Sequence, residues 1–512
     1  MASDTATNGT ANANGTKTGM GNRSVTTTQG KASKPTDIET RLFINNEFVD
    51  ASSKEYITVR NPYDDSIVTD KLHSASDKDV DAAVAAARKA FKPWAAVRPQ
   101  ERTAILLKFA DLIEQNADRV AALESVCGGT ALSFMKSIHV PFCVRTFRYY
   151  AGWCDKMEGE SFPADNGYLR IVRHQPLGVC AAIIAFNGPA IMFAMKAAPA
   201  LAAGNCLVIK PSEKSPLSTL YLAQLAVEAG FPPGVLNVVN GTGSVGAAIA
   251  AHLDIQKLSF TGSVGVAKKI AALASGSNLK KVTFELGGKS PSIIFPDANL
   301  DVAIAWCTRS ITDSSGQACV ASSRVYVHQD IKDEFLRRFK ESFEKIHDTY
   351  GDPFDEKKTN GPIVDHVQHE RVLGLVESGK QQATLVTGGA RLLESGCFVQ
   401  PTIFADSLAD ARVHREEIFG PVVVVNSFQD EDEVIATAND TDYGLSGAVF
   451  TQDINRAMRV AAQINSGTVG VNCCGMIDPQ VPFGGFKQSG IGRELGKYGW
   501  LDYTETKTVY IK

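Results

Sequence analysis

The feature that most constrains the fold is a run of short apolar segments that alternate with helical patterns from residue 178 onward. Residues 178–186 predict a buried strand, and residues 190–204 predict a helix that ends at Gly204. The same alternation continues to residue 286 and includes a predicted strand at 205–210, and a separate helix is predicted at about 77–91, where Ser76 and Asp79 form a capping-box start. Strands that are apolar on both faces are typical of a parallel sheet covered by helices. We therefore predict a doubly wound α/β domain of the nucleotide-binding type.

A second α/β stretch is predicted between residues 287 and 485. Its candidate strands are 323–328, 398–405, 421–428 and 467–472, and its clearest helices are near 330–346 and 453–464. Residues 499–512 contain an alternating segment that reads as an end strand. Such a strand needs a partner edge, which another subunit could supply.

The N-terminal segment and the cysteines bear on location. Residues 1–38 are predicted to form a disordered polar tail, because they are rich in Ser, Thr, Asn, Gly and Ala and hold almost no large apolar residue. They contain no apolar secretion signal. The 10 cysteines form no CxxC pair and no zinc-finger spacing, which favours a reduced intracellular protein without a metal. We expect a cytoplasmic location, with a mitochondrial presequence as the alternative.

The charge balance limits the possible partners. The 52 Lys and Arg residues nearly match the 56 Asp and Glu residues, which leaves a net charge of -4. This argues against a broad surface for nucleic acid or for an anionic membrane. Residues 177–195 are apolar enough to resemble a membrane span, but Asn187, Gly188 and Pro189 interrupt them. A strand, a loop and a helix fit that segment better. We expect no nucleic acid and no membrane as partners.

Three polar residues stand out as candidates for chemistry. Glu285 ends the predicted strand 281–285, and Asn187 follows the predicted strand 178–186. Ligands of doubly wound sheets bind beyond the carboxyl ends of strands, so both residues lie where a site is expected. The third is Cys319, which follows a turn rich in Ser and Gly. Each alone has an ordinary explanation as core filler, solvated carboxylate or turn former.

The segments around these residues match a known family. FELGGKSP (284–291) and SSGQACVASSR (314–324) resemble the two active-site signatures of the aldehyde dehydrogenase superfamily. The order and spacing of the blocks fit that family from about residue 41 to residue 512. Further matching blocks are KPSEKSP (210–216), FTGS (260–263), EEIFGPV (416–422) and PFGGFKQSGIGRE (482–494).

The resemblance implies an architecture. It implies two doubly wound α/β domains, a Rossmann-like cofactor domain and a catalytic domain, together with a small β oligomerisation arm, and an assembly as a homodimer or homotetramer. The NAD-binding domain would comprise residues 39–156 and 177–286, the catalytic domain residues 287–485, and the arm and C-terminal strand residues 157–176 and 486–512.

The resemblance also implies catalytic roles. Cys319 would be the nucleophile that adds to the aldehyde carbonyl. The Asn187 amide and the backbone N–H of Cys319 would stabilise the oxyanion of the thiohemiacetal. Hydride would pass to the nicotinamide of NAD, and Glu285 would activate the water that hydrolyses the thioester to the carboxylic acid.

The cofactor contacts are assigned in the same way. Lys210 and Glu213 would reach the adenosine ribose, and Glu213 would repel a 2′-phosphate, which favours NAD over NADP. Glu417 and Phe419 would hold the nicotinamide ribose and ring.

The pyrophosphate would lie beside Gly262 and Ser263, at the N-terminus of the following helix. Gly243 belongs to a GxGxxG pattern at 241–246, but no acidic residue follows at the expected distance of about 20 positions. That loop therefore receives only a supporting role beside the adenine. The second glycine that usually follows FTGS is replaced by Ala267.

The predicted substrate tunnel departs from the family pattern. The position after Asn187, often a Phe in the family, is Gly188. This change predicts a tunnel that is wider than one built for acetaldehyde and serves a bulky or polar aldehyde. The alternative is that other side chains fill the gap. The residues assigned to the tunnel are Gly188, Met192, Met195, Asp313, Ala318, Val320, Ile477 and Phe483.

Two other functions compete with a hydrolytic dehydrogenase. A CoA-acylating dehydrogenase would release its thioester to CoA and would need no base to activate water, so the presence of Glu285 argues against it. A catalytically idle scaffold would keep the fold alone, and the joint presence of Cys319, Glu285 and Asn187 argues against that.

Overall fold

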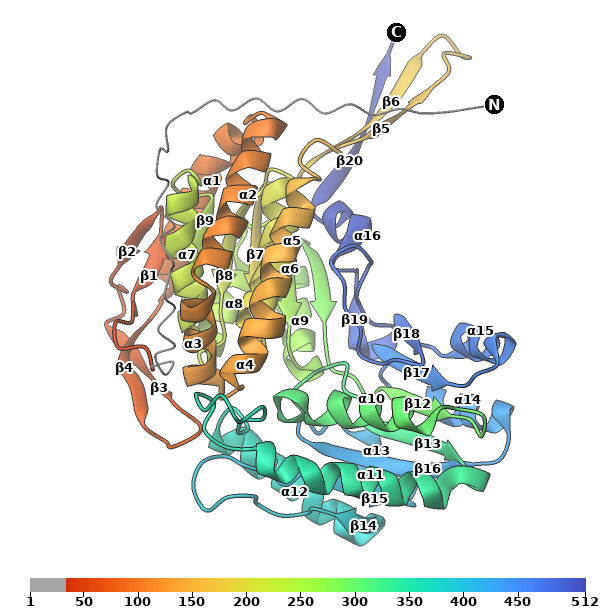
Figure 1. Ribbon diagram of the computed structural model, residues 1–512. Helices are drawn as coiled ribbons and strands as arrows, with labels where there is room; N and C mark the ends of the chain where they lie inside the picture. Colours follow the sequence, from red (N-terminus) through yellow and green to blue (C-terminus); the bar gives the residue numbers. More distant parts are fainter. Residues whose placement is uncertain (1–33) are drawn as a thin grey trace, which may run out of the picture. The chain divides into compact units, whose positions relative to one another are not determined.

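The computed structural model describes residues 34–512 (Figure 1). Nearly all of the predicted disordered tail, residues 1–38, lies outside these described residues. The described part contains two large, mostly parallel sheets with helices packed on them. The predicted α/β class with doubly wound sheets is therefore confirmed.

The first sheet has eight strands in the order β19-β11-β10-β7-β8-β9-β1-β2. Among the parallel strands of this sheet, β7 comes first in the chain and lies in the middle. β8 and β9 follow on one side of β7, and the chain then crosses to β10 on the other side. Strand order therefore reverses between β7 and β10, and ligands bind at such a point in doubly wound sheets. The five parallel strands are β7 (Val179–Ile183), β8 (Cys206–Lys210), β9 (Leu236–Val238), β10 (Lys257–Thr261) and β11 (Lys281–Glu285).

Three short antiparallel strands complete the edges of this sheet. They are β1 (Leu42–Ile44), β2 (Glu47–Val49) and β19 (Gly490–Ile491). In β19 the C-terminal part of the chain returns to the first sheet, where Gly490 pairs with Glu285. The predicted first strand, 178–186, was too long, because regular pairing ends at Ile183 and Asn187 lies in the loop that follows.

Helices surround the first sheet as the sequence predicts. The helix predicted at 77–91 begins where expected, and the Asp79 carboxylate accepts a hydrogen bond from the Ser76 N–H at 2.8 Å. The helices are α1 (Asp77–Ala95), α2 (Pro99–Gln115), α3 (Ala117–Gly128), α4 (Leu132–Phe134), α5 (Val140–Ala151), α6 (Pro189–Ala202), α7 (Leu217–Ala229), α8 (Gly243–Ala251) and α9 (Val264–Ser277).

The second sheet has seven strands in the order β14-β15-β16-β13-β12-β17-β18. They are β12 (Pro291–Ile294), β13 (Arg324–His328), β14 (Thr384–Thr387), β15 (Thr402–Ala405), β16 (Val422–Phe428), β17 (Ser446–Phe450) and β18 (Thr468–Val471). The sequence reading missed β12, β14 and β17, since each has only four or five residues and too few large apolar side chains to stand out. The helices are α10 (Leu300–Thr312), α11 (Lys332–Ile346), α12 (His366–Gln382), α13 (Arg412–Arg415), α14 (Glu431–Asn439) and α15 (Ile454–Gln463). A further short helix, α16 (Gly496–Leu501), contacts α6 and β20 instead.

The remaining strands form two small sheets. The predicted end strand is β20 (Thr504–Ile511), which pairs with β6 (Leu169–Pro176), and β6 pairs with β5 (Gly159–Phe162). This three-stranded arm projects beyond the helices (Figure 1). A separate hairpin joins β3 (Glu55–Arg60) to β4 (Ile67–Ser74). No helix within residues 34–512 is long and apolar enough to cross a membrane.

Candidate active site

The segment that joins the two large sheets lies directly against the loop of Cys319. Residues 286–290 connect β11 to β12. A Cβ atom on Gly288 would lie 2.2 Å from the carbonyl oxygen of Cys319, and one on Gly287 would lie 2.2 Å from Oε2 of Glu417. Only glycine allows this close approach of backbone and carboxylate. The two glycines of FELGGKSP therefore bring Glu285, Cys319 and Glu417 to one place.

The turn before Cys319 has an unusual backbone. Ser314 and Ser315 adopt φ values of 49° and 55°, and Gly316 follows with a φ of 70°. Left-handed non-glycine residues carry strain that the surrounding structure must hold, and they are frequent at functional sites. The surroundings do hold this turn: Ser315 Oγ donates to the carbonyl oxygen of Gly361 at 2.5 Å, and a Cβ on Gly316 would overlap Gly420 O at 2.2 Å.

Cys319 is half-buried, whereas eight of the other nine cysteines are fully buried. Burial raises the pKa of its thiol, and the nearby carboxyls of Glu285 and Glu417 raise it further; backbone N–H groups act in the opposite direction. These effects favour the neutral thiol. Its reaction with a carbonyl requires removal of the thiol proton, because the thiolate is the nucleophile.

Glu285 lies at the carboxyl end of β11 with 4% of its surface exposed, and its Oε1 has no hydrogen-bond partner among the described residues. Burial raises its pKa well above the ordinary value, and Glu494 adds to the effect. A buried carboxyl with one free oxygen and a raised pKa is suited to take up a proton near neutral pH.

Asn187 and the loop of Cys319 are joined by a hydrogen bond. The Asn187 Nδ2 donates to the carbonyl oxygen of Gln317 at 2.8 Å. This bond uses one of the two amide hydrogens, so one donor is left for another acceptor. Asn187 thus has both a fixed orientation and an unused N–H.

These residues share one cavity of about 400 Å³. Cys319, Glu285 and Asn187 all line it, as do all eight residues that the sequence assigned to the substrate tunnel. The lining comes from β10 and β11 of the first sheet, from helices that include α5, α6 and α10, and from the loops that follow α10 and β18, so the cavity lies at the carboxyl edge of the first sheet. Most of its surface is apolar, as is common for small-molecule sites.

Several lining residues were missed by the sequence reading. Phe134, Ile138, His139, Phe142 and Arg145 come from α4, the turn after it and α5. No local sequence signal points to them. The spacing of apolar residues predicts which face of a helix is buried, but not whether that face borders a cavity. The others are Ile191, Thr261, Trp306, Arg309, Ser310, Ser314, Gln317, Cys474, Gly475, Met476 and Glu494.

Glu494 is a buried carboxylate among the missed residues. It is 8% exposed, and its Oε1 accepts hydrogen bonds from Lys196 Nζ and from Ser259 Oγ, the latter at 3.1 Å. Lys196 is fully buried. A buried lysine and glutamate are tolerated because each neutralises and hydrogen-bonds the other. Glu494 belongs to the block PFGGFKQSGIGRE, but no sequence pattern assigns it a role.

The carboxyl edge of the first sheet has residues that fit a dinucleotide. Lys210 ends β8, and its buried Nζ donates to Pro211 O at 3.0 Å and lies 3.5 Å from Glu213 Oε2. Burial lowers the pKa of Lys210, and Glu213 opposes that effect. The Glu213 side chain is 38% exposed. Its carboxylate is therefore positioned beside a cation and open to accept hydrogen bonds from ribose hydroxyls.

The N-terminus of α9 fits a pyrophosphate. Ser263 is its N-cap, but the hydroxyl caps no backbone N–H, and the first turn has no acidic residue. A Cβ on Gly265 in that turn would meet no atom within 4 Å, which leaves the approach open. Free N–H groups at a helix N-terminus form an anion site. Gly262 has no room for a side chain, since a Cβ would lie 2.5 Å from the Phe260 ring. Gly243 opens α8, and the space beside it is also free.

Glu417 and Phe419 are held beside the same edge. The Glu417 Oε1 accepts from the Gly288 N–H at 3.0 Å, and burial raises the pKa of this carboxyl to about 7. Phe419 has a φ of 57°, and its ring packs edge-on against Phe186 with centroids 5.6 Å apart. Phe186 directly precedes Asn187, which lines the cavity.

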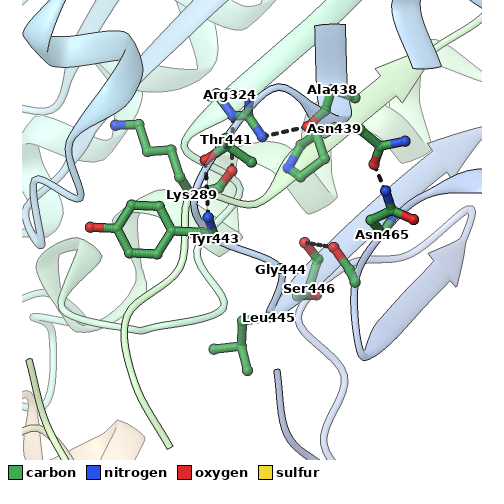
Figure 2. A pocket seen from close by; sticks show the side chains of 12 residues that line it. Lys289, Arg324, Ala438, Asn439, Thr441, Tyr443, Gly444, Leu445, Ser446 and Asn465 are labelled. Atoms are coloured by element: carbon green, nitrogen blue, oxygen red, sulfur yellow. Dashed lines mark hydrogen bonds between the residues drawn. The ribbon is translucent and has the colours of Figure 1, made fainter. Parts of the chain in front are cut away.

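A second, narrow pocket surrounds Lys289 and Arg324, and none of the sequence-predicted site residues lines it (Figure 2). The Arg324 Nε donates to Lys289 O at 2.8 Å, and its Nη2 donates to Ala438 O at 2.8 Å. The Lys289 Nζ is buried without a partner among residues 34–512, and burial lowers its pKa to about 7. These contacts fix the end of the segment that carries Gly287 and Gly288.

The fold and the cavity together define a dinucleotide-binding α/β enzyme with a thiol, a carboxylate and an amide at one site. The comparisons give the family. The model of the aldehyde dehydrogenase family matches residues 48–509. The chain belongs to this family, as its motifs predicted, and it is an NAD-dependent enzyme that oxidises aldehydes to carboxylic acids.

Individual relatives agree with this placement. The chain is 47% identical to an aldehyde dehydrogenase of Emericella nidulans, over 92% of this chain and 95% of the relative. It is also 47% identical to aldehyde dehydrogenase 1A1 of Gallus gallus, over 92% and 93% of the two chains. Among solved structures, an indole-3-acetaldehyde dehydrogenase of P. syringae in complex with NAD⁺ is 39% identical, with a TM-score of 0.91 over 93% of this chain and 97% of that chain. A putative aldehyde dehydrogenase of Burkholderia cenocepacia is 42% identical, with a TM-score of 0.90 over 93% and 98%.

Proposed function

We propose that this chain oxidises aldehydes through a covalent intermediate on Cys319. The observation that carries the proposal is that Cys319, Glu285 and Asn187 line one cavity. The Cys319 sulfur adds to the carbonyl carbon to form a thiohemiacetal. The free N–H of Asn187 and the backbone N–H of Cys319 donate to the oxygen as it becomes negative.

Lys210 and Glu213 would hold the adenosine ribose of NAD, Ser263 and the first turn of α9 its pyrophosphate, and Glu417 and Phe419 its nicotinamide end. Bound NAD would supply the acceptor for the hydride of the aldehyde carbon. Glu285 then takes a proton from the water that attacks the thioester, which restores the thiol and releases the acid. Its free Oε1 and its raised pKa support this role as general base.

Replacing the nucleophile tests the proposal. We expect Cys319→Ala to reduce aldehyde oxidation by about 10⁴-fold or more, since loss of a covalent nucleophile removes the pathway rather than weakening one contact. NADH formation would be measured together with the thermal shift caused by NAD, which should persist. Cys473→Ala is the matched control, because Cys473 is half-buried but does not line the cavity. Full activity of Cys319→Ala would refute the assignment.

We further propose that the substrate is bulkier or more polar than acetaldehyde. The cavity of about 400 Å³ and the polar lining residues Asp313, Arg145 and Arg309 support this. The gap expected at Gly188 is partly occupied, since a Cβ there would lie 3.3 Å from the His139 ring. A panel of aldehydes compared by kcat/KM, with NAD and NADP in parallel, tests both substrate and cofactor preference. A clear preference for acetaldehyde would overturn the proposal on size, and equal use of NADP would overturn the role of Glu213.

The domain roles, the assembly and the compartment are also proposals. Residues 39–156 and 177–286 would bind NAD, and residues 287–485 would supply the nucleophile. The arm of residues 157–176 and 486–512 would join subunits into a homodimer or homotetramer, and exposed apolar side chains on its strands support this. The reduced cysteines support a cytoplasmic location.

A further inference from the structure

A π-helical turn brings His139 to the cavity. The turn, Met135–His139, lies between α4 and α5. Such a turn inserts one extra residue into the helical ladder, changes the direction of the side chains around it, and is frequent at functional sites. His139 is its last residue and lines the substrate cavity with a ring that is only 6% exposed.

One nitrogen of this ring is fixed by a buried carboxylate. His139 Nδ1 lies 3.3 Å from Glu124 Oε2. Glu124 is 1% exposed, and its Oε1 accepts from the Ala190 N–H at 2.5 Å and from Ser218 Oγ at 3.1 Å. A carboxylate that collects donors in this way acts as an acceptor, so Nδ1 carries a proton. The tautomer and the orientation of the ring follow from that bond.

The other nitrogen has no partner. Nε2 of His139 makes no hydrogen bond to any residue between 34 and 512. Its ring neighbour Cε1 would lie 3.3 Å from a Cβ on Gly188, which also lines the cavity and directly follows Asn187. The imidazole therefore occupies space next to the oxyanion residue, at the position where the sequence predicted a missing wall.

The surroundings leave the substrate as the partner for Nε2. Of the other lining residues in this segment, Phe134, Ile138 and Phe142 are apolar, and the Phe134 ring packs against His139 with centroids 5.4 Å apart. The charged residue Arg145 has its guanidinium over the Phe142 ring. An enclosed polar atom in an apolar wall favours a ligand that can hydrogen-bond it over one that cannot.

We propose that His139 is a specificity-determining residue, whose Nε2 hydrogen-bonds a polar substituent of the aldehyde beyond the reacting carbonyl. This inference rests on the proposed function and names a substrate class for it: aldehydes that carry a hydroxyl or a similar group at the position His139 reaches. An apolar group of the same size at that position would leave Nε2 unpaired and would be a poorer substrate.

Pairs of isosteric aldehydes test the proposal. The probes are the three hydroxybenzaldehydes and the three tolualdehydes, and the corresponding phenylacetaldehydes, each followed by NADH fluorescence with the full-length enzyme. The readout is the hydroxyl-to-methyl ratio of kcat/KM at each ring position. We expect a ratio of about 10 to 100 at one position in the native protein, and a loss of that excess in His139→Phe. Comparing ratios between variants cancels the intrinsic reactivity of each aldehyde.

Controls separate this role from a structural one. His328→Phe is the matched control, because His328 lies outside the cavity, and it should keep the native ratio. If His139→Phe melts before assay temperature, Gly188→Ala replaces it, since its Cβ would press on the His139 ring and should change the ratio. A native enzyme without preference at any position, or an unchanged ratio in these variants, overturns the inference. Failure of the proposed function would differ, since no aldehyde would then yield NADH.

Discussion

At the scale of single residues, the site depends on groups whose pKa is shifted by burial. Glu285 keeps a free oxygen and a raised pKa because it is buried, beside β19 and near Glu494. The same burial that makes Glu285 a useful base makes it costly to ionise. Activity should therefore depend on pH through the protonation of this carboxyl.

The pH dependence has a definite sign. A base must be deprotonated to act, so hydrolysis of the thioester should slow as pH falls through the raised pKa of Glu285. In Glu285→Gln we expect kcat to fall by about 10²- to 10⁴-fold, while one equivalent of NADH still forms rapidly. Stopped-flow measurement of the burst at several pH values checks this. A variant without a burst, or with native kcat, would contradict the assignment of Glu285 to hydrolysis.

At the scale of secondary-structure elements, the two large sheets place the site residues at the ends of their strands. The carboxyl edge of the first sheet carries Asn187, Lys210, Thr261 and Glu285 on or just after its strands. The loop of Cys319 precedes β13, so the second sheet contributes from its amino edge. The short segment from β11 to β12 joins these edges, and its two glycines set the distance between them.

The N-terminus of α9 can be tested as an anion site. Gly265 is exposed, and a Cβ there meets no atom within 4 Å, so a side chain fits. A carboxylate in the first turn favours the helix by about 0.3–1 kcal/mol, but it would repel a pyrophosphate. We expect Gly265→Asp to raise the Kd for NAD about 5- to 10-fold relative to Gly265→Ala, because the added carboxylate would repel the pyrophosphate across a few ångström of water. Calorimetric titration with NAD measures it. The alanine variant accounts for added bulk and helix propensity, and equal Kd values in both variants would exclude the site.

At the scale of the whole molecule, the arm leaves apolar residues without cover. Leu169 and Ile511 are cross-strand partners, and they are 40% and 47% exposed. Phe162 on β5 and Tyr510 on β20 are also exposed. An exposed apolar sheet with open edges is a surface for another chain.

The arm predicts that the protein is an oligomer, whose mass falls when the exposed residues of the arm are replaced. We expect the native protein to have two or four times the subunit mass of 54.9 kDa, and Leu169→Lys combined with Ile511→Lys to shift it toward the monomer. Light scattering coupled to size-exclusion chromatography measures this. Leu253→Lys is the control, because Leu253 is 67% exposed but far along the chain from the arm. An unchanged mass in the double variant would exclude the arm as the interface.

The sequence predicted the fold class well, because apolar strands and amphipathic helices are local patterns. It predicted the α1 start at Asp77 and the strands around Cys206–Lys210 and Lys281–Glu285. It missed β12 and β17, whose short segments form strands through pairing with neighbouring strands. It also missed His139, since one extra residue in a helix leaves no readable trace in the chain.

Sequence motifs were enough to predict the family, the reaction and the candidate nucleophile and base, because these depend on residue types in a fixed order. The shape of the substrate cavity became visible only in the folded structure. Gly188 suggested an opening, but His139, distant in sequence, occupies the space beside it. Cavity walls are assembled from segments whose contact depends on the packing of several elements, and no local pattern records that packing.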